Sequence, residues 1–212
     1  YEKFYYDDGS IILQAENILY KVYRRTLGLK SQFFETMLTL PISTDNVGGL
    51  NGTSDATALP LVHTTAEVDA LFYFIFNEHD WSTDRPSIAS LCSVLKLSTF
   101  YLIDSGRDYS IHHLSSHPEL QSSLRLHLAC RFDIEAWVGI AFRELMSVSI
   151  LNITNEDRDL IGSEAYHILV VTHAQVDLHR ARLAFGPPKA VHANDCVDEP
   201  DCSKTWYQAW WG

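Results

Sequence analysis

The chain has 212 residues, of which 46% are hydrophobic and 20% are charged, and its formal net charge is −11. This length gives one large domain, or two small ones, a proper hydrophobic core. The longest unbroken apolar run, residues 70–76, is far shorter than the ~20 residues of a membrane-spanning helix. The negative charge argues against nucleic acid as a partner, because phosphate binding relies on clustered Lys and Arg.

The cysteines, rather than the start of the chain, indicate the compartment. The chain begins at Tyr1 rather than Met, so we expect further residues to precede it. Four cysteines are too few for a disulfide-built scaffold of this length. Cys92 and Cys130 occur in apolar helical patterns, where a free thiol behaves as a small hydrophobe. The sequence therefore favours a cytoplasmic or nuclear protein.

Strand patterns come first along the chain. Residues 4–7 and 11–14 are extended runs joined by Asp8-Gly9-Ser10, which predicts a β-hairpin. After a turn at Glu16-Asn17, residues 17–23 alternate in the manner of a half-buried strand.

A Phe-rich helix follows from Ser31, which can cap the first amides, and Pro41 ends it. Its apolar stripe consists of Phe33, Phe34, Met37 and Leu38. A polar loop then leads to one more short strand within residues 58–64.

Beyond residue 64 the pattern is helical. Thr64 with Glu67 predicts a capping box, and Asp84 with Pro86 predicts the start of the next helix. The cleanest amphipathic stripe comprises Ile134, Trp137, Val138, Ala141, Phe142, Leu145 and Met146. Strands first and helices afterwards predict an α+β fold, with a seam at residues 115–118.

The last helical stretch is divided. Thr154 and Asp157 predict the start of a short helix interrupted at Gly162. A long helix then runs to about Ala184, where Gly186-Pro187-Pro188 stops it. The predicted core of the first unit comprises Ile18, Tyr20 or Leu19, Phe33, Phe34, Leu71, Phe72, Ile75, Leu91 and Leu95.

Three stretches in this order resemble the BTB/POZ domain. They are "ILYKVYRRTLGLKSQFFETML" (18–38), "LPLVHTTAEVDALFYFIFN" (59–77) and "SVLKLSTFYLIDSGRDYSIHHL" (93–114). Further on, "IEAWVGIAFRELM", "NITNEDRDLIG" and "LHRARLA" resemble the helical extension of fungal BTB proteins. The resemblance covers about residues 4–185 and departs at Tyr23, where the family usually has His.

The resemblance implies a BTB/POZ domain over residues 1–115, a short β-sheet flanked by a helix cluster. An all-helical extension over 116–185 and a tail with Cys and Trp over 186–212 follow. It also implies a non-catalytic protein–protein interaction module that associates with itself as a homo-oligomer and recruits other proteins. Some relatives are adaptors of cullin-class ubiquitin ligases, and others act in transcriptional regulation.

Catalytic motifs are missing from the sequence. It contains no GxxxxGK[ST], GxGxxG, GxSxG or HExxH pattern, and "NVGGLNG" (46–52) lacks the lysine of a phosphate loop. We therefore expect no enzyme, no cofactor, and no catalytic or cofactor-binding residues. The alternative is a metal-dependent hydrolase that uses scattered His, Asp and Glu residues.

The histidines do not favour that alternative. His167, His173 and His179 recur every six residues, and six residues turn a helix by about 600°, so neighbours point ~120° apart. His112 and His113 are adjacent and point in different directions. "NEHDW" (77–81) collects acidic groups and a His at a helix end, which does not make a site by itself.

The tail carries His192, Cys196 and Cys202 as His-x3-Cys-x5-Cys, followed by Trp206, Trp210 and Trp211. Structural zinc usually takes four ligands, so the pattern favours free thiols over a zinc site or a disulfide, and no metal ligand is assigned. The tryptophans predict an apolar helical stripe that docks on the chain's own domain or on a partner.

Overall fold

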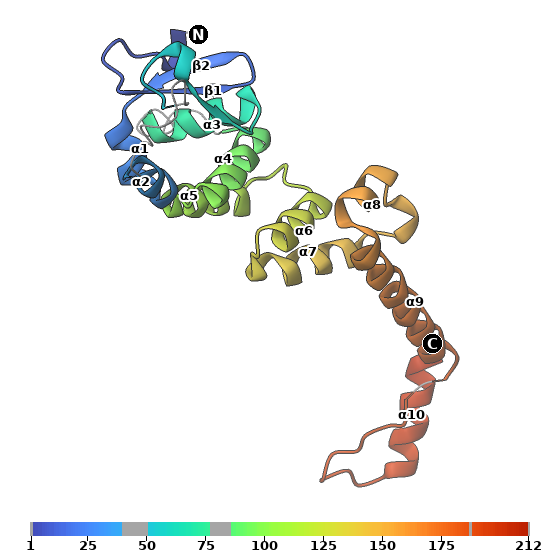
Figure 1. The fold of residues 1–212 in the computed structure, drawn as a ribbon. Coiled ribbons are helices and arrows are strands. Elements are labelled where there is room, and N and C mark those ends of the chain that lie inside the picture. The colour runs from blue at the N-terminus through green and yellow to red at the C-terminus, as the bar shows by residue number, and fades with distance from the viewer. Residues whose placement is uncertain (1, 40–50, 77–85, 187, 212) are drawn as a thin grey trace. The chain divides into compact units, whose positions relative to one another are not determined.

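The computed structural model describes residues 2–39, 51–76, 86–186 and 188–211 (Figure 1). By their contacts these residues form two compact units, Tyr1–Leu120 and Gln121–Gly212. The division lies a few residues after the seam expected at 115–118. Helices and one three-stranded sheet make up the regular structure of the described residues, so the class is α+β, as predicted.

The sheet belongs to the first unit. Strand β1 (Ile11–Ala15) pairs antiparallel with β2 (Ile18–Val22) across the turn at Glu16-Asn17, where Glu16 has a φ of 51°. Strand β3 (Leu59–Leu61) pairs with β1 in parallel, so the order is β2-β1-β3. The predicted strands at 11–14, 17–23 and 58–64 are confirmed, and β3 lies at one edge of the described sheet.

The hairpin predicted from residues 4–7 and 11–14 is wrong. Glu2–Phe4 is a 3₁₀ helix (η1), and Tyr5 alone forms a β-bridge, to Lys21 on the outer side of β2. The reason lies in the strand order, because β1 already has β2 on one side and β3 on the other. Residues 4–7 therefore have no open edge of β1 to pair with.

Two short helices join the hairpin to the rest of the unit. The residues between the predicted strand and the predicted Phe-rich helix form a short helix of their own, α1 (Arg24–Lys30). Ser31 separates it from α2 (Gln32–Thr39), and its hydroxyl oxygen accepts the Phe34 amide at 3.1 Å, as predicted. The same hydroxyl donates to the Tyr101 carbonyl at 2.5 Å. Pro41 lies outside the described residues.

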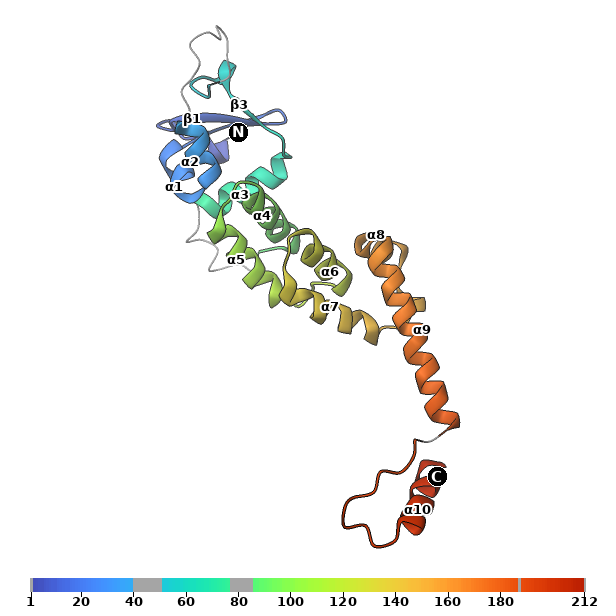
Figure 2. The ribbon, with the colours of Figure 1, turned by 60° about the horizontal axis from the view of Figure 1, so that its bottom comes forward.

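Three longer helices complete the first unit and gather on one face of the sheet (Figures 1 and 2). They are α3 (Thr65–Phe76), α4 (Ile88–Phe100) and α5 (Asp104–Ser115). The capping box is confirmed, since the Glu67 carboxylate accepts the Thr64 amide at 3.2 Å. The N-cap of α4 is Ser87, whose hydroxyl accepts the Ser90 amide at 3.1 Å. Asp84 lies outside the described residues.

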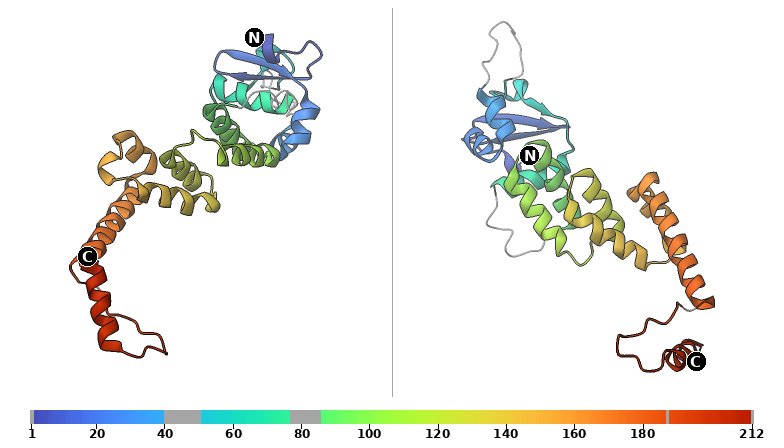
Figure 3. Two further views of the ribbon diagram at one scale, coloured as in Figure 1. Left: turned by 180° about the vertical axis from the view of Figure 1, so that it is seen from behind. Right: turned by 90° about the horizontal axis from the view of Figure 1, so that it is seen from below.

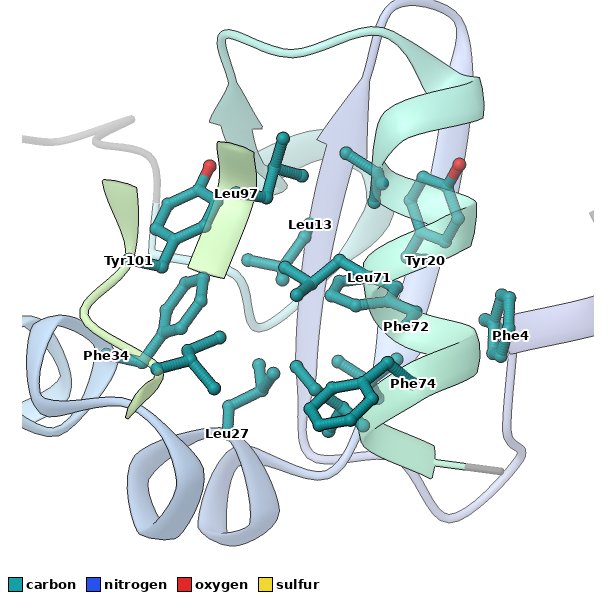
Figure 4. Packing of buried hydrophobic residues seen from close by; sticks show 14 of the residues in the cluster. Phe4, Leu13, Tyr20, Leu27, Phe34, Leu71, Phe72, Phe74, Leu97 and Tyr101 are labelled. Carbon is teal, nitrogen blue, oxygen red and sulfur yellow. The ribbon is translucent and has the colours of Figure 1, made fainter. Parts of the chain in front are cut away.

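The core of the first unit lies between the sheet and these helices (Figure 4). The predicted core residues Tyr20, Phe34, Leu71, Phe72, Ile75, Leu91 and Leu95 are buried. Phe33 was also predicted there, and that is wrong, because its side chain is 37% exposed. Neighbouring residues on a helix point about 100° apart, so α2 directs Phe34 inward and Phe33 along the surface. Ile18 and Leu19 are half-buried.

The second unit is helical. Helices α6 (Ser122–Arg131) and α7 (Glu135–Ser147) lie side by side (Figure 3), and α8 (Asn155–Ile161) and α9 (Ser163–Phe185) follow after a 3₁₀ turn, η4 (Ile150–Asn152). The predicted stripe of α7 buries Ile134, Trp137, Ala141 and Leu145, whereas Val138 is exposed. Thr154 and Asp157 form the predicted helix start, and Gly162, with a φ of 82°, separates α8 from α9.

The tail folds back on itself. The segment after Pro188 loops out and returns through α10 (Glu199–Trp211), as Figure 3 shows. The Trp206 indole nitrogen donates to the Pro188 carbonyl at 3.0 Å, and the rings of Trp206 and Trp210 lie 5.7 Å apart. Part of the predicted tryptophan stripe therefore exists, and it ties the two ends of the loop together.

Candidate functional site

An apolar patch covers the surface where α2, β3 and the end of α4 meet. We define the aromatic patch as Phe33, Val62, Phe100 and Leu102, whose side chains are all exposed. The rings of Phe33 and Phe100 lie 6.3 Å apart. The Gln32 amide donates to the Leu102 carbonyl at 3.4 Å, which brings the α4–α5 turn beside α2. An exposed cluster of this kind is a mark of an interaction surface.

A groove of about 210 Å³ runs beside the aromatic patch. It is lined by Leu13, Phe33, Phe34, Met37, Leu59, Pro60, Leu61, Val62, Phe100 and Tyr101. Its lining contains no charged side chain. Because β3 is an edge strand, one wall of the groove is a strand with no neighbour on its outer side among the described residues. The groove can bind an apolar segment, but it holds no acid–base pair for chemistry.

The turn between α4 and α5 holds the Leu102 side chain in solvent with a strained backbone conformation. This residue has a φ of 54° and its side chain is 52% exposed. Residues other than glycine rarely adopt positive φ, and a leucine there gains nothing from solvent. The aromatic patch is thus built partly from a strained position.

His63 lies behind the aromatic patch. Its ring contacts the rings of Phe100 and Tyr101 at 4.9 and 5.4 Å, and its Nε2 is buried without a hydrogen-bond partner. Burial lowers the pKa of His63, and Lys96 lowers it further, whereas Glu67 acts in the opposite direction. The imidazole is therefore neutral at pH 7.

We expect His63 to make the first unit less stable in mild acid. The unfolded chain takes up the proton near the ordinary His pKa of ~6.5, before the folded chain does. The free energy of unfolding should fall as the pH drops through this value, and level off below the folded-state pKa of His63. Denaturant titrations between pH 5 and 8 should show a shallower fall in His63→Phe. Equal pH dependence in both proteins would contradict this prediction.

The evenly spaced histidines of α9 lie apart from any cluster of potential metal ligands. Among the described residues, His167, His173 and His179 belong to no group of three or more potential metal ligands. His173 lines a hollow of about 450 Å³ between the end of α7 and α9, with Asp177 and Arg180. The stretch "NEHDW" and most of "NVGGLNG" lie outside the described residues. Among the residues that the structure describes, no three His, Asp or Glu side chains come close enough to hold a metal ion.

The tail brings together one histidine and two cysteines, whose thiols we expected from the sequence to be free. The ligand atoms of His192, Cys196 and Cys202 all lie within 4.8 Å of one another. Cys196 Sγ is 3.5 Å from His192 Nδ1, and His192 Nε2 is 3.1 Å from the Ser203 hydroxyl. The irregular spacing hid this cluster, because the loop of 193–198 has no periodicity from which convergence can be predicted.

The other two thiols differ from these. Burial raises the pKa of Cys92 to about 11, so this thiol stays protonated and unreactive at neutral pH. Cys130 is exposed at the end of α6. Both thiols lie outside the tail cluster, so they can be used as control thiols in experiments on it.

The chain matches no protein-family model and no curated protein. Among the described helices, none has the length and apolar character that crossing a bilayer requires.

Proposed function

We propose that the chain is a non-catalytic protein–protein interaction module whose first unit is a BTB/POZ domain that binds a second copy of itself. The order of elements supports the domain proposal. An antiparallel pair β1–β2 is followed by the helical pair α1–α2, a strand that returns beside β1, and then α3, α4 and α5. The resemblance implies a short β-sheet flanked by a helix cluster, and this arrangement supports it.

The observation that carries the association proposal is the aromatic patch beside the open edge of β3. Edge strands offer unpaired backbone groups to another chain, and natural proteins usually protect them with charge, covering segments, short length or proline. β3 is three residues long and has no amide at Pro60, so its side chains must contribute most of the contact. Here the edge lies next to apolar side chains, with Val62 83% exposed immediately after the strand. Edge and patch together are the elements of strand-addition or groove binding.

A second copy is the occupant that the patch fits best. The patch contains no charged residue, so a partner recognised by charge has nothing to pair with there. An apolar surface is complementary to itself, and its self-pairing gives an isologous, two-fold interface, the commonest symmetry among soluble oligomers. We therefore assign the patch to a homodimer.

The patch variants Val62→Glu and Phe100→Glu should abolish association of the full chain. Each would place a carboxylate in the proposed apolar interface, where its desolvation is costly. In sedimentation velocity over a concentration series, the average mass of the parent should rise with concentration, and both variants should stay monomeric. The matched control is Leu151→Glu, an 89% exposed leucine of the second unit, which should behave as the parent.

Two results would overturn the proposal. One is a parent protein that remains monomeric over the whole concentration range. The other is a loss of association in Leu151→Glu equal to that in the patch variants, since a general effect of added charge would then explain both.

Salt should strengthen the association. Two copies that each carry a net charge of −11 repel each other, and salt screens that repulsion without weakening apolar contacts. The dimer dissociation constant should therefore fall when NaCl is raised from low to physiological concentration. A dissociation constant that rises with salt would indicate an ion-paired interface elsewhere on the molecule.

A further inference from the structure

We propose that His192, Cys196 and Cys202 bind one Zn²⁺ ion through His192 Nδ1 and the two thiolate sulfurs. Imidazole nitrogen and thiolate sulfur are the ligands that zinc prefers. This site is separate from the aromatic patch, and it would exist whether or not the chain associates with itself.

The distances fit a tetrahedral ion. With Zn–S near 2.3 Å and Zn–N near 2.0–2.1 Å, tetrahedral ligand atoms lie about 3.6–3.8 Å apart. Cys196 Sγ and His192 Nδ1 are 3.5 Å apart, and all three ligand atoms lie within 4.8 Å of one another. Cys202 is the exposed member, so a small rotation of its side chain closes the remaining distance.

The surroundings fit as well. A zinc-bound histidine donates its other ring N–H to a nearby acceptor, which fixes its tautomer. His192 Nε2 lies 3.1 Å from the Ser203 hydroxyl, so Ser203 can fill this role. Cys202 lies in the first turn of α10, close to Cys196. The Asp198 side chain caps that turn by accepting the Asp201 amide at 3.0 Å.

A metal also supplies the stability that this segment otherwise lacks. None of the side chains described between residues 188 and 210 is buried. Pieces of chain this small usually need a metal or disulfides to hold a fixed conformation. Zinc would clamp the loop of 188–198 onto α10 and hold the Trp206–Trp210 pair in place. The tail supplies three ligands, and water takes the fourth coordination position.

The test is metal analysis of the full chain, purified reduced and without a polyhistidine tag. We expect about one Zn²⁺ per chain, lost in Cys196→Ser and in Cys202→Ser but retained in Cys130→Ser. Replacing zinc with Co²⁺ should produce sulfur-to-cobalt charge-transfer absorption in the same proteins. Circular dichroism of each variant shows that the helical units remain folded.

Two further measurements sharpen the test. Ser203→Ala keeps all three ligands, so it should still bind zinc but with roughly 10–100-fold lower affinity. Zinc should also protect Cys196 and Cys202 from alkylation, while Cys130 reacts at the same rate with or without it. A reduced parent chain that takes up no Zn²⁺, or one that binds it equally well after both tail thiols are replaced, would overturn the proposal. A Cys196–Cys202 disulfide that re-forms in excess Zn²⁺ would overturn it too.

Discussion

Replacing Phe34 with alanine should lower the free energy of unfolding by about 3–5 kcal/mol, the usual range for emptying a buried aromatic site. Phe34 is 1% exposed, and its ring stacks on that of Tyr101 at 4.8 Å. It lies where α2 meets the sheet and α4, so its loss leaves a cavity between several elements that cannot all move to fill it. Denaturant titration of the full chain, followed by circular dichroism, measures the effect.

The neighbouring residue provides the control. Phe33→Ala removes the same number of atoms from the same helix, but from a side chain that is 37% exposed. It should therefore cost much less stability, while weakening self-association through the aromatic patch. If Phe33→Ala destabilised the chain as much as Phe34→Ala, the orientation of α2 described above would be wrong.

A second large effect is expected at Gly106, in the first turn of α5. A Cβ atom at this position would lie 2.2 Å from Ser98 Oγ and 3.1 Å from both Ser98 Cβ and a ring carbon of Phe74. The glycine therefore lets α5 approach α4 and α3 closely. Gly106→Val should lower the free energy of unfolding by about 1–3 kcal/mol, the usual cost of overpacking a core.

Gly139, in α7, is the matched control for that substitution. A Cβ at Gly139 would meet nothing within 4 Å. Gly139→Val should change the free energy of unfolding by less than about 0.5 kcal/mol, as exposed substitutions usually do. A Gly106→Val protein as stable as the control would show that α4 and α5 are not in close contact at this point.

Local patterns predicted much of the fold because each depends on neighbouring residues. The strand of residues 17–23, the Ser31 cap and the Thr64–Glu67 capping box are determined within a few positions, and all were found. The hairpin at residues 4–7 failed because pairing is decided by distant parts of the chain. Once β3 occupies one side of β1, the first extended run has no partner there.

The candidate sites were harder to predict for a related reason. The aromatic patch joins α2, β3 and the end of α4, which are far apart in the sequence, and Phe33 had the same apolar pattern as buried Phe34. The thiol cluster depends on the path of an irregular loop, which brings Cys196 to His192 and both to the start of α10. Neither arrangement follows a helical or strand period. The sequence grouped the three tail residues but favoured free thiols, and no pattern in it indicated the aromatic patch.

Hydrogen exchange as a function of protein concentration tests the proposed association most directly, because it locates the surface as well as detecting it. As the full chain passes from monomer to dimer, the amides of Leu59 and of residues 61–63, and those around Phe33 and Phe100, should exchange more slowly. The amides of α7, including those around Val138, should be unchanged. Protection that appears only in the second unit, or exchange that does not depend on concentration anywhere, would contradict association through the aromatic patch.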